Sequence, residues 1–394
     1  MYGFVFVLSK GRLVDAVLCE CPDRVPVVLR PGRFVEWLYG DGGWRGQVRV
    51  VEDFGCDGFI YVDAWPPDPL LFSDASFPEG VSVKKKIVVE NGRRFLVREV
   101  VTRRGCLREV RRLVDDELLS RLRSMDIVSD KWVPEEYPLI KEYFVKDYGD
   151  LDALECLLNP FTGGMLNELR EAVCVTGGKG LVHASFPSPV NEAVHAYGLK
   201  NLLVACYRDP GFVEELLEVF QSYLVDLIEV VLRETGVDAV YVSWCYGSLS
   251  AGWNPRLWKR FIEPLVREQV EVTRAYGGFY HYYDDGACMR LLPLIKDTGV
   301  DILSTLPPPP AGDVESMGEA KKIVGDRVCL VGNLSIELLR YGRVEEVERE
   351  ARRIVGEAAP YLGFILGPSD GLHAYTPLEN VRAFVRAAEE YPLV

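Results

Sequence analysis

Eight short apolar runs recur along the chain, and most of them are separated by stretches with the hydrophobic spacing of helices. A run of this length that ends at glycine, proline or a polar residue is typical of a buried β-strand. Strands that alternate with helices form parallel sheets, and eight of them predict a closed (β/α)8 barrel, the TIM-barrel fold. The runs cover residues 24–30, 57–63, 181–185, 237–243, 279–283, 301–305, 328–333 and 363–367.

The helical stretches between these runs include residues 189–235, 255–274 and 344–359. A doubly wound open sheet has the same alternation of strands and helices. In that fold a G-x-G-x-x-G motif often follows the first strand, and the sequence has none there. The pattern therefore favours the barrel.

Residues 82–148 interrupt the alternation. Two β-rich runs, Lys86–Glu90 and Arg93–Thr102, flank the dipeptide Asn91-Gly92. Asn-Gly between two such runs is a strong hairpin signal, because both turn positions need positive φ. We expect one barrel domain over residues 1–394, in which residues 82–148 form an antiparallel hairpin and a charged connection inserted after the second strand.

The charge of the chain narrows the class of partner. It is 48% apolar and 26% charged, which is typical of a globular protein, and 45 basic against 59 acidic residues give a net charge of −14. A field of that sign opposes nucleic acids and anionic membranes. The basic run Lys84-Lys85-Lys86 is typical of a solvated hairpin face. We therefore expect a small-molecule partner, not a nucleic acid or a membrane.

The ten cysteines are scattered without regular spacing, which does not indicate a disulfide framework. Residues 1–8 are apolar but lack the basic start and the cleavage site of a secretory signal. No run reaches the ~18 apolar residues of a membrane span. These features predict a reduced, cytoplasmic protein.

Polar residues stand at the predicted strand ends, where a parallel barrel keeps its chemistry. The stretch from Gly277 to Gly286 is the clearest case, because an aromatic strand there ends in His281, Asp284 and Asp285 and the chain has only four histidines. We predict Asp63, His281 and Asp285 as catalytic groups, Arg30, Arg33, Trp244, Asp284, Asn333 and His373 as substrate-binding groups, and His281 and Asp370 as candidate metal ligands.

The residue types leave several roles open. A histidine near carboxylates serves either as an acid/base group or as part of a metal site with an open position. Arg30 and Arg33 fit a clamp on a substrate carboxylate or phosphate, and equally fit ion pairs with barrel carboxylates such as Asp63. Asp284 and Asp285 also fit helix N-cap positions.

The C-terminal two-thirds of the sequence resembles the superfamily of uroporphyrinogen decarboxylases and corrinoid-dependent methyltransferases. The matching pieces occur in the same order as in that superfamily, whose fold is a (β/α)8 barrel. They are His281 with Asp285-Gly286, then residues 291–301, 309–313, 331–334 and 376–381.

Two branches of this superfamily resemble different parts of the chain. In the decarboxylases an arginine-rich motif after the first strand and an aspartate after the second hold a tetrapyrrole, and Arg30-Pro-Gly-Arg33-Phe34 and Asp63 look like these features. In the methyltransferases zinc is held by H-x-C after strand five and a cysteine after strand eight. His281 matches that histidine, whereas Tyr283 and Asp370 stand where the cysteines would be.

Residues 100–107 and 136–141, with Asp150-Leu151, resemble methyltransferase members more than dedicated decarboxylases. The resemblance therefore implies a methyltransferase-like enzyme that moves a methyl group to or from a corrinoid or a small acceptor, with zinc as a possible metal. It leaves two alternatives: a uroporphyrinogen decarboxylase, and a non-catalytic protein that binds a tetrapyrrole or corrinoid. A corrinoid protein is a possible partner, and a homodimer is a possible assembly.

Overall fold

The structure is a computed structural model that describes residues 9–66, 70, 77–115, 117, 119–121, 139–158 and 163–389. The chain divides into two compact units. The parallel-sheet unit comprises residues 1–64, 163–187 and 225–394, and the antiparallel-sheet unit comprises residues 65–162 and 188–224.

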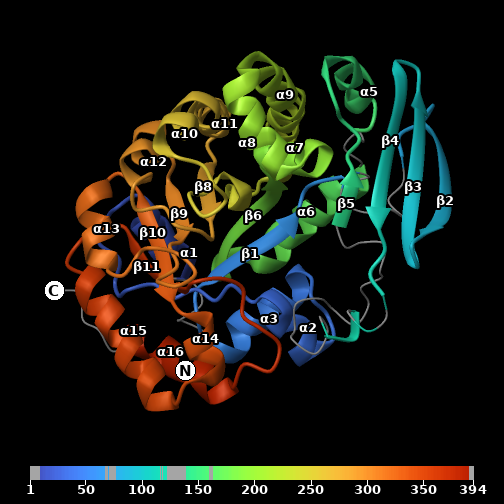
Figure 1. Cartoon of the computed structure of the whole chain (residues 1–394). Helices are drawn as coiled ribbons and strands as arrows, with labels where there is room; N and C mark the ends of the chain where they lie inside the picture. The colour runs from blue at the N-terminus through green and yellow to red at the C-terminus, as the bar shows by residue number, and fades with distance from the viewer. Residues whose placement is uncertain are drawn as a thin grey trace. The chain divides into compact units, whose positions relative to one another are not determined.

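Seven parallel strands form the curled sheet of the parallel-sheet unit, in the order β1-β6-β7-β8-β9-β10-β11 (Figure 1). They lie at seven of the eight predicted runs, with ends that differ by a few residues. The register places Tyr61 beside His183, and Tyr241 beside His281. The strands are β1 (Gly58–Asp63), β6 (Gly180–Pro187), β7 (Ala239–Ser243), β8 (Phe279–Asp284), β9 (Ile302–Thr305), β10 (Cys329–Leu334) and β11 (Phe364–Pro368).

The remaining predicted run, residues 24–30, comes first in the chain and forms two isolated parallel bridges in place of a regular strand. The Val28 N–H donates to the Leu366 carbonyl at 2.9 Å, and the Asp57 N–H donates to the Val27 carbonyl at 2.7 Å. Pro26 has no N–H to donate, which explains why a longer ladder does not form. The segment nevertheless lies between β11 and the start of β1.

Helices surround the outer face of this sheet, and α10 to α16 follow one another around it (Figure 1). Helix α9 (Pro210–Thr235) contains residues of both units. The others are α1 (Ser9–Val17), α2 (Gly32–Tyr39), α3 (Trp44–Phe54), α6 (Gly163–Thr176), η3 (Gly177–Lys179), η4 (Cys245–Gly247), α10 (Pro255–Phe261), α11 (Glu263–Ala275), α12 (Leu292–Thr298), α13 (Met317–Val324), α14 (Ile336–Tyr341), α15 (Val344–Ala358) and α16 (Leu378–Glu389). No helix of the described residues is long and apolar enough to cross a membrane.

Helix α1 packs against the amino-terminal ends of the strands. Its Leu13 and Val17 are buried in one apolar cluster with Phe59, Leu181 and Ile302, which lie at the starts of β1, β6 and β9. Burying apolar surface in this way is the main favourable term in folding. This end of the sheet is therefore filled by core, and access for a ligand is left to the opposite, carboxyl ends.

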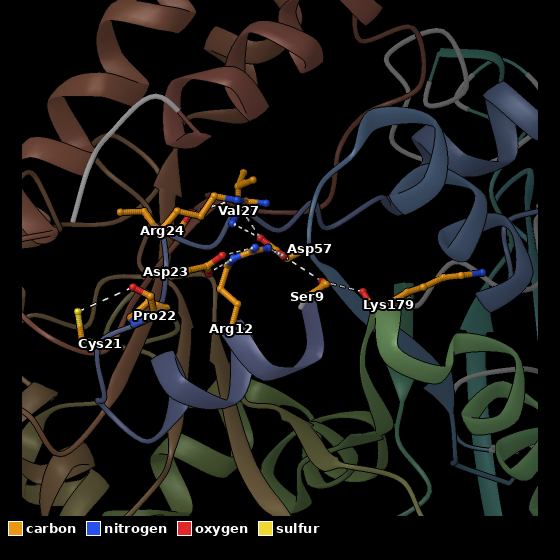
Figure 2. Close-up of polar contacts among 10 residues, drawn as sticks. Ser9, Arg12, Cys21, Pro22, Asp23, Arg24, Val27, Asp57 and Lys179 are labelled. Atoms are coloured by element: carbon orange, nitrogen blue, oxygen red, sulfur yellow. Dashed lines mark hydrogen bonds and ion pairs between the residues drawn. The ribbon is translucent and has the colours of Figure 1, made fainter. Parts of the chain in front are cut away.

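A buried polar network holds α1 in place (Figure 2). The Asp57 carboxylate accepts hydrogen bonds from Arg12 at 2.6 Å, from Ser9 at 2.9 Å and from the Val27 N–H at 3.0 Å. Arg12 is almost fully buried and also pairs with Asp23. Because a buried charge is costly unless it is paired and hydrogen-bonded, Asp57 fixes both α1 and the segment before β1.

The antiparallel-sheet unit contains a four-stranded sheet in the order β2-β3-β4-β5. Asn91 and Gly92 have φ of 51° and 75°, and β2 pairs antiparallel with β3, so the predicted hairpin is confirmed. Its elements are β2 (Ser82–Glu90), β3 (Arg93–Thr102), β4 (Gly105–Arg112), β5 (Leu139–Glu142), η2 (Tyr148–Asp150), α5 (Leu151–Glu155), α7 (Pro189–Tyr197) and α8 (Leu199–Arg208). Residues 122–138 of the predicted connection lie outside the described residues.

Candidate functional site

Four side chains meet at the carboxyl ends of the parallel strands, and we call them the Arg30 cluster: Arg30, Tyr283, Asp285 and Asp370. Arg30 Nη1 donates to Asp370 Oδ1 at 2.9 Å, and the guanidinium lies 3.9 Å from the centre of the Tyr283 ring. The Tyr283 hydroxyl lies 3.0 Å from Asp370 Oδ1 and 3.3 Å from Asp285 Oδ2, and its single proton is donated to one of these two carboxylates at a time. One cation, one phenol and two carboxylates thus share one site.

Two loops bring Arg30 and Asp370 together from opposite ends of the sequence. The Leu372 N–H donates to the Arg30 carbonyl at 2.8 Å, which ties the loop after β11 to the segment before α2. Gly32 has φ of +47°, and a Cβ on it would lie 2.8 Å from the Leu372 carbonyl oxygen. Only glycine tolerates both this conformation and this close approach.

The cluster is partly open to solvent. The Arg30 side chain is 26% exposed and that of Asp370 is 42% exposed, whereas Tyr283 is buried. Desolvation and then the charge of Asp370 raise the pKa of the Asp285 carboxyl, although Arg30 acts in the opposite direction. A carboxyl with a raised pKa keeps its proton closer to neutral pH, as a general acid must.

His281 lies deeper, in the middle of β8. It is fully buried, and its Nε2 is 2.7 Å from the Ser304 hydroxyl. Its ring centre is 5.1 Å from that of His183 and 5.0 Å from that of Tyr241. Burial, the neighbouring His183 and Arg30 all lower the pKa of His281, so the imidazole stays neutral at physiological pH.

An aromatic layer that the sequence analysis did not predict lies between His281 and the Arg30 cluster. Tyr61 lies 5.2 Å from His183 and 4.9 Å from Tyr241, and Tyr241 lies 5.4 Å from Tyr283, measured between ring centres. These residues occur at every second position of their strands, the spacing that points side chains to one face of a sheet. This spacing is visible in the sequence and could have predicted the aromatic layer.

Two predicted aspartates lie on different sides of the sheet. Asp63 ends β1 and is exposed, and partial desolvation followed by the charge of Glu168 raises the pKa of its carboxyl. Asp284 is fully buried, and its Oδ1 accepts a hydrogen bond from the Gly286 N–H at 2.9 Å. Asp284 therefore stabilises the turn after β8 and is not a helix cap, since α12 begins only at Leu292.

Trp244 and Asn333, two predicted binding residues, are both buried and make hydrogen bonds within the protein. Trp244 is fully buried, stacks on Tyr282 and donates its indole N–H to the Tyr280 hydroxyl at 3.1 Å. Tyr280 and Tyr282 alternate with His281 along β8 and so face the helices. The side-chain amide of Asn333 donates to the Leu306 and Val314 carbonyls, in the loop after β9, at 2.9 Å each.

The two remaining predicted binding residues lie three positions along the chain from Arg30 and from Asp370. Arg33 is half-buried in the first turn of α2. His373 is half-buried in the loop after β11, where its carbonyl accepts from the Thr376 hydroxyl at 2.8 Å.

The residues present do not fit a zinc ion at His281 and Asp370. The described residues contain no group of three or more histidine, cysteine, aspartate or glutamate side chains that suits a metal. His281 Nε2 is engaged with Ser304, and Asp370 already accepts from Arg30 and Tyr283. The positive charge that neutralises Asp370 is therefore the guanidinium of Arg30.

A family model described as uroporphyrinogen decarboxylase (URO-D) matches residues 128–391, which is more than half of the chain. The chain belongs to the uroporphyrinogen decarboxylase family. The matched range includes β6 to β11 and three of the four residues of the Arg30 cluster, Tyr283, Asp285 and Asp370.

Relatives of both predicted branches are similar to this family member. It is 32% identical over 235 residues to the methylated-thiol–coenzyme M methyltransferase of Methanosarcina mazei (59% of each chain). It is 25% identical over 205 residues to the uroporphyrinogen decarboxylase of Chlorobium luteolum (50% of this chain, 55% of the relative). It is 24% identical over 204 residues to the methylcobamide:CoM methyltransferase MtaA of Methanosarcina barkeri (52% and 56%). The chain thus spans less than two thirds of these relatives' lengths, and all of them are named as enzymes.

A solved structure shares the fold over nearly the whole chain. The methyltransferase from Methanosarcina mazei matches with a TM-score of 0.63 over 97% of this chain and 98% of that chain, at 16% sequence identity. At this identity the likeness concerns the fold alone, and it agrees with an α/β architecture built on a curled parallel sheet.

Proposed function

We propose that this family member is an enzyme that transfers a methyl group between a corrinoid and an oxygen atom of an anionic small molecule. The single observation that carries this proposal is the Arg30 cluster, in which a cation, a phenol and two carboxylates occupy the carboxyl ends of the strands. The similarity to methyltransferases supports methyl transfer as the reaction class.

We further infer that the curled sheet closes as a (β/α)8 barrel within one domain, with residues 82–148 inserted. The bridges of Val27 to Leu366 and of Val28 to Asp57 support closure, because they join the segment before α2 to both edges of the seven-stranded sheet. In a barrel the carboxyl ends of all strands face one mouth. Asp63 would then contact the same substrate from β1.

Arg30 is the anchor for the substrate in this mechanism. Only Nη1 of its guanidinium is engaged by Asp370, and the fork of remaining donors suits a carboxylate or phosphate oxygen. The contact with Tyr283 and the bond to Asp370 fix the guanidinium plane. A substrate held there is oriented toward Asp285 and Tyr283.

Asp285 supplies the proton. When the methyl group leaves an oxygen for the corrinoid, the O–CH3 bond breaks and the oxygen takes a proton in place of the methyl group. The raised pKa of Asp285 keeps such a proton available, and the Tyr283 hydroxyl lies within 3.3 Å of that carboxylate. In the reverse direction the same carboxylate accepts the proton from the attacking hydroxyl. The contact between His281 and the Ser304 hydroxyl fixes both side chains beneath the Arg30 cluster.

An anaerobic assay tests the reaction class. The protein is mixed with chemically reduced cobalamin and methoxylated aromatic carboxylates, and methylcobalamin is followed by its absorbance. We expect formation by the wild type and a loss of 10²-fold or more in Asp285→Asn, since general acids contribute roughly that much. Tyr341→Phe, at an exposed tyrosine of α14, is the control and should match the wild type. No methyl transfer from any of these donors would contradict the proposal.

Decarboxylation of a tetrapyrrole is the second candidate. The observation that favours it is a site with an arginine at its centre, whose residues do not fit zinc, in a member of the decarboxylase family. Anaerobic incubation with uroporphyrinogen distinguishes the two, because this candidate predicts coproporphyrinogen and no methylcobalamin. Tight binding of a corrinoid or tetrapyrrole without either product would identify a binding protein.

A further inference from the structure

The antiparallel sheet is a basic region of an acidic protein. Residues 82–115 contain eleven lysine and arginine residues against four aspartate and glutamate residues, whereas the whole chain has a net charge of −14. These residues form strands β2, β3 and β4 (Figure 1). Like charges that lie close together repel one another, so an excess of this size favours contact with groups of negative charge.

Acidic side chains neutralise several of these cations. In the interior of the sheet, Arg98 and Arg111 share the buried carboxylate of Glu109, at 2.7 and 2.8 Å. Three more cations pair with carboxylates at the surface: Lys86 with Glu99, Arg104 with Glu155 and Arg108 with Glu142. Partners of this kind make these five side chains part of the folded framework.

Three further arginines pair with no carboxylate of the described residues, and they line one cavity of about 200 Å³. They are Arg93 and Arg94, at the start of β3, and Arg112, at the end of β4. We call these three residues the arginine site. Asp115 lines the same cavity, so three positive charges meet one negative charge there. Several guanidiniums around one cavity are a recurrent arrangement for binding anions.

Regular strand pairing holds the backbone of the arginine site in place. Arg112 lies opposite Phe95 in the ladder of β3 and β4, and the Leu113 N–H donates to the Arg94 carbonyl at 3.0 Å. Leu113 also lines the cavity and is buried. A ligand therefore meets a formed backbone and has to order only the arginine side chains, which lowers the entropic cost of binding.

The donors and the size of the cavity define the class of ligand. A guanidinium presents a fork of N–H donors that suits carboxylates and phosphates. A phosphomonoester carries close to two negative charges at neutral pH and has three acceptor oxygens, whereas a carboxylate carries one charge and has two oxygens. Three arginines therefore match the phosphate better. Pockets that enclose a whole small ligand measure ~300–1,000 Å³, so this smaller cavity suits the phosphate group alone.

We propose that the arginine site binds the dianionic phosphate group of a small phosphomonoester. It belongs to the antiparallel-sheet unit, whereas the Arg30 cluster belongs to the parallel-sheet unit, so the proposal does not depend on methyl transfer. A single phosphate group fits better than a nucleic acid, because the net charge of the chain repels an extended phosphate backbone.

Isothermal titration calorimetry of the full chain with phenyl phosphate tests the site. We expect the Arg30→Gln variant, which lacks the cation of the other anion site, to bind one phenyl phosphate. Arg112→Gln should weaken this binding about tenfold or more, because it removes a charge-assisted hydrogen bond. Arg103→Gln is the matched control, since Arg103 is an exposed arginine of the same sheet outside the cavity, and binding should stay unchanged. Circular dichroism of each variant verifies that the sheet has folded.

Two comparisons test the dianion. Binding of phenyl phosphate should weaken as the pH falls below ~6, where the phosphate takes up its second proton. Benzoate, a monoanion, should bind about tenfold more weakly or less. The proposal is overturned if phenyl phosphate does not bind, if its binding is lost in Arg30→Gln and kept in Arg112→Gln, or if Arg103→Gln weakens it as much as Arg112→Gln. A single-stranded oligonucleotide that binds more tightly than phenyl phosphate and depends on Arg103 would also overturn it, and would identify a nucleic-acid surface.

Discussion

The coupling between Arg30 and Asp370 gives the sharpest prediction about the site. The two groups lie 2.9 Å apart, and their side chains are 26% and 42% exposed. Exposed pairs are typically worth ~0.2–1 kcal/mol, whereas removing one partner of a fully buried pair costs ~3–5 kcal/mol. An intermediate exposure therefore predicts a coupling of about 1–2 kcal/mol.

Other contacts keep this coupling from being larger. Asp370 still accepts from Tyr283 and from the Gly371 N–H when Arg30 is removed. Its carboxylate is then only partly unpaired, and solvent reaches it. The contact of the guanidinium with the Tyr283 ring is separate from Asp370, and Arg30→Gln loses its ~0.5–2 kcal/mol whether or not Asp370 is also changed, so it does not enter the coupling.

A double-mutant cycle measures the coupling. kcat/KM for methyl transfer is determined for Arg30→Gln, Asp370→Asn and the double variant, with thermal unfolding as the folding control. We expect the double variant to be about 5–30-fold more active than the product of the single effects, because 1.4 kcal/mol corresponds to about tenfold. Single effects that multiply to within about twofold would refute the conclusion that the two side chains act as a pair.

Three further predictions concern stability and pH. Asp57→Ala should lower the free energy of unfolding by ~3–5 kcal/mol in urea titrations, because it removes the buried acceptor shared by Arg12, Ser9 and the Val27 N–H. Asp23→Ala, at a half-exposed carboxylate, should cost less than ~1 kcal/mol, because Arg12 keeps its pair with Asp57. Burial lowers the pKa of His183 to about 3, so only the unfolded chain binds that proton between about pH 6.5 and 3, and stability should fall with falling pH by up to ~1.4 kcal/mol per unit. His183→Leu should flatten this dependence of the urea midpoint. Demethylation should decline as pH rises through the pKa of Asp285, and Arg30→Gln should move that decline in the pH–rate profile to higher pH, because Arg30 lowers this pKa.

The strands were predictable because their hydrophobic runs are short, strongly apolar and bounded by turn residues. The turn at Asn91-Gly92 was predictable for a similar local reason, since its backbone needs positive φ at both positions. The predicted run before Arg30 contains Pro26, and it forms bridges and no regular strand. The apolar run therefore predicted where this segment lies, whereas the missing N–H of Pro26 explains why it does not pair as a regular strand.

The site was predictable in part. His281 and Asp285 were expected at the end of one strand, but they lie at different depths along it, because His281 is buried within β8 and Asp285 lies just past its carboxyl end. Trp244 follows β7, and its ring stacks on Tyr282 of the next strand, a contact that no local pattern in the sequence encodes. The pairing of Arg30 with Asp370 joins residues 340 positions apart, and no local pattern encodes it.

Methylcobalamin formation before and after treatment with a chelator tests the central claim most directly. The claim is that the Arg30 cluster performs the chemistry with its own cation and its own acid. We predict that the chelated protein keeps the wild-type rate and that Asp285→Asn loses 10²-fold or more. An activity that disappears with the chelator, returns with zinc and is unaffected by Asp285→Asn would contradict it.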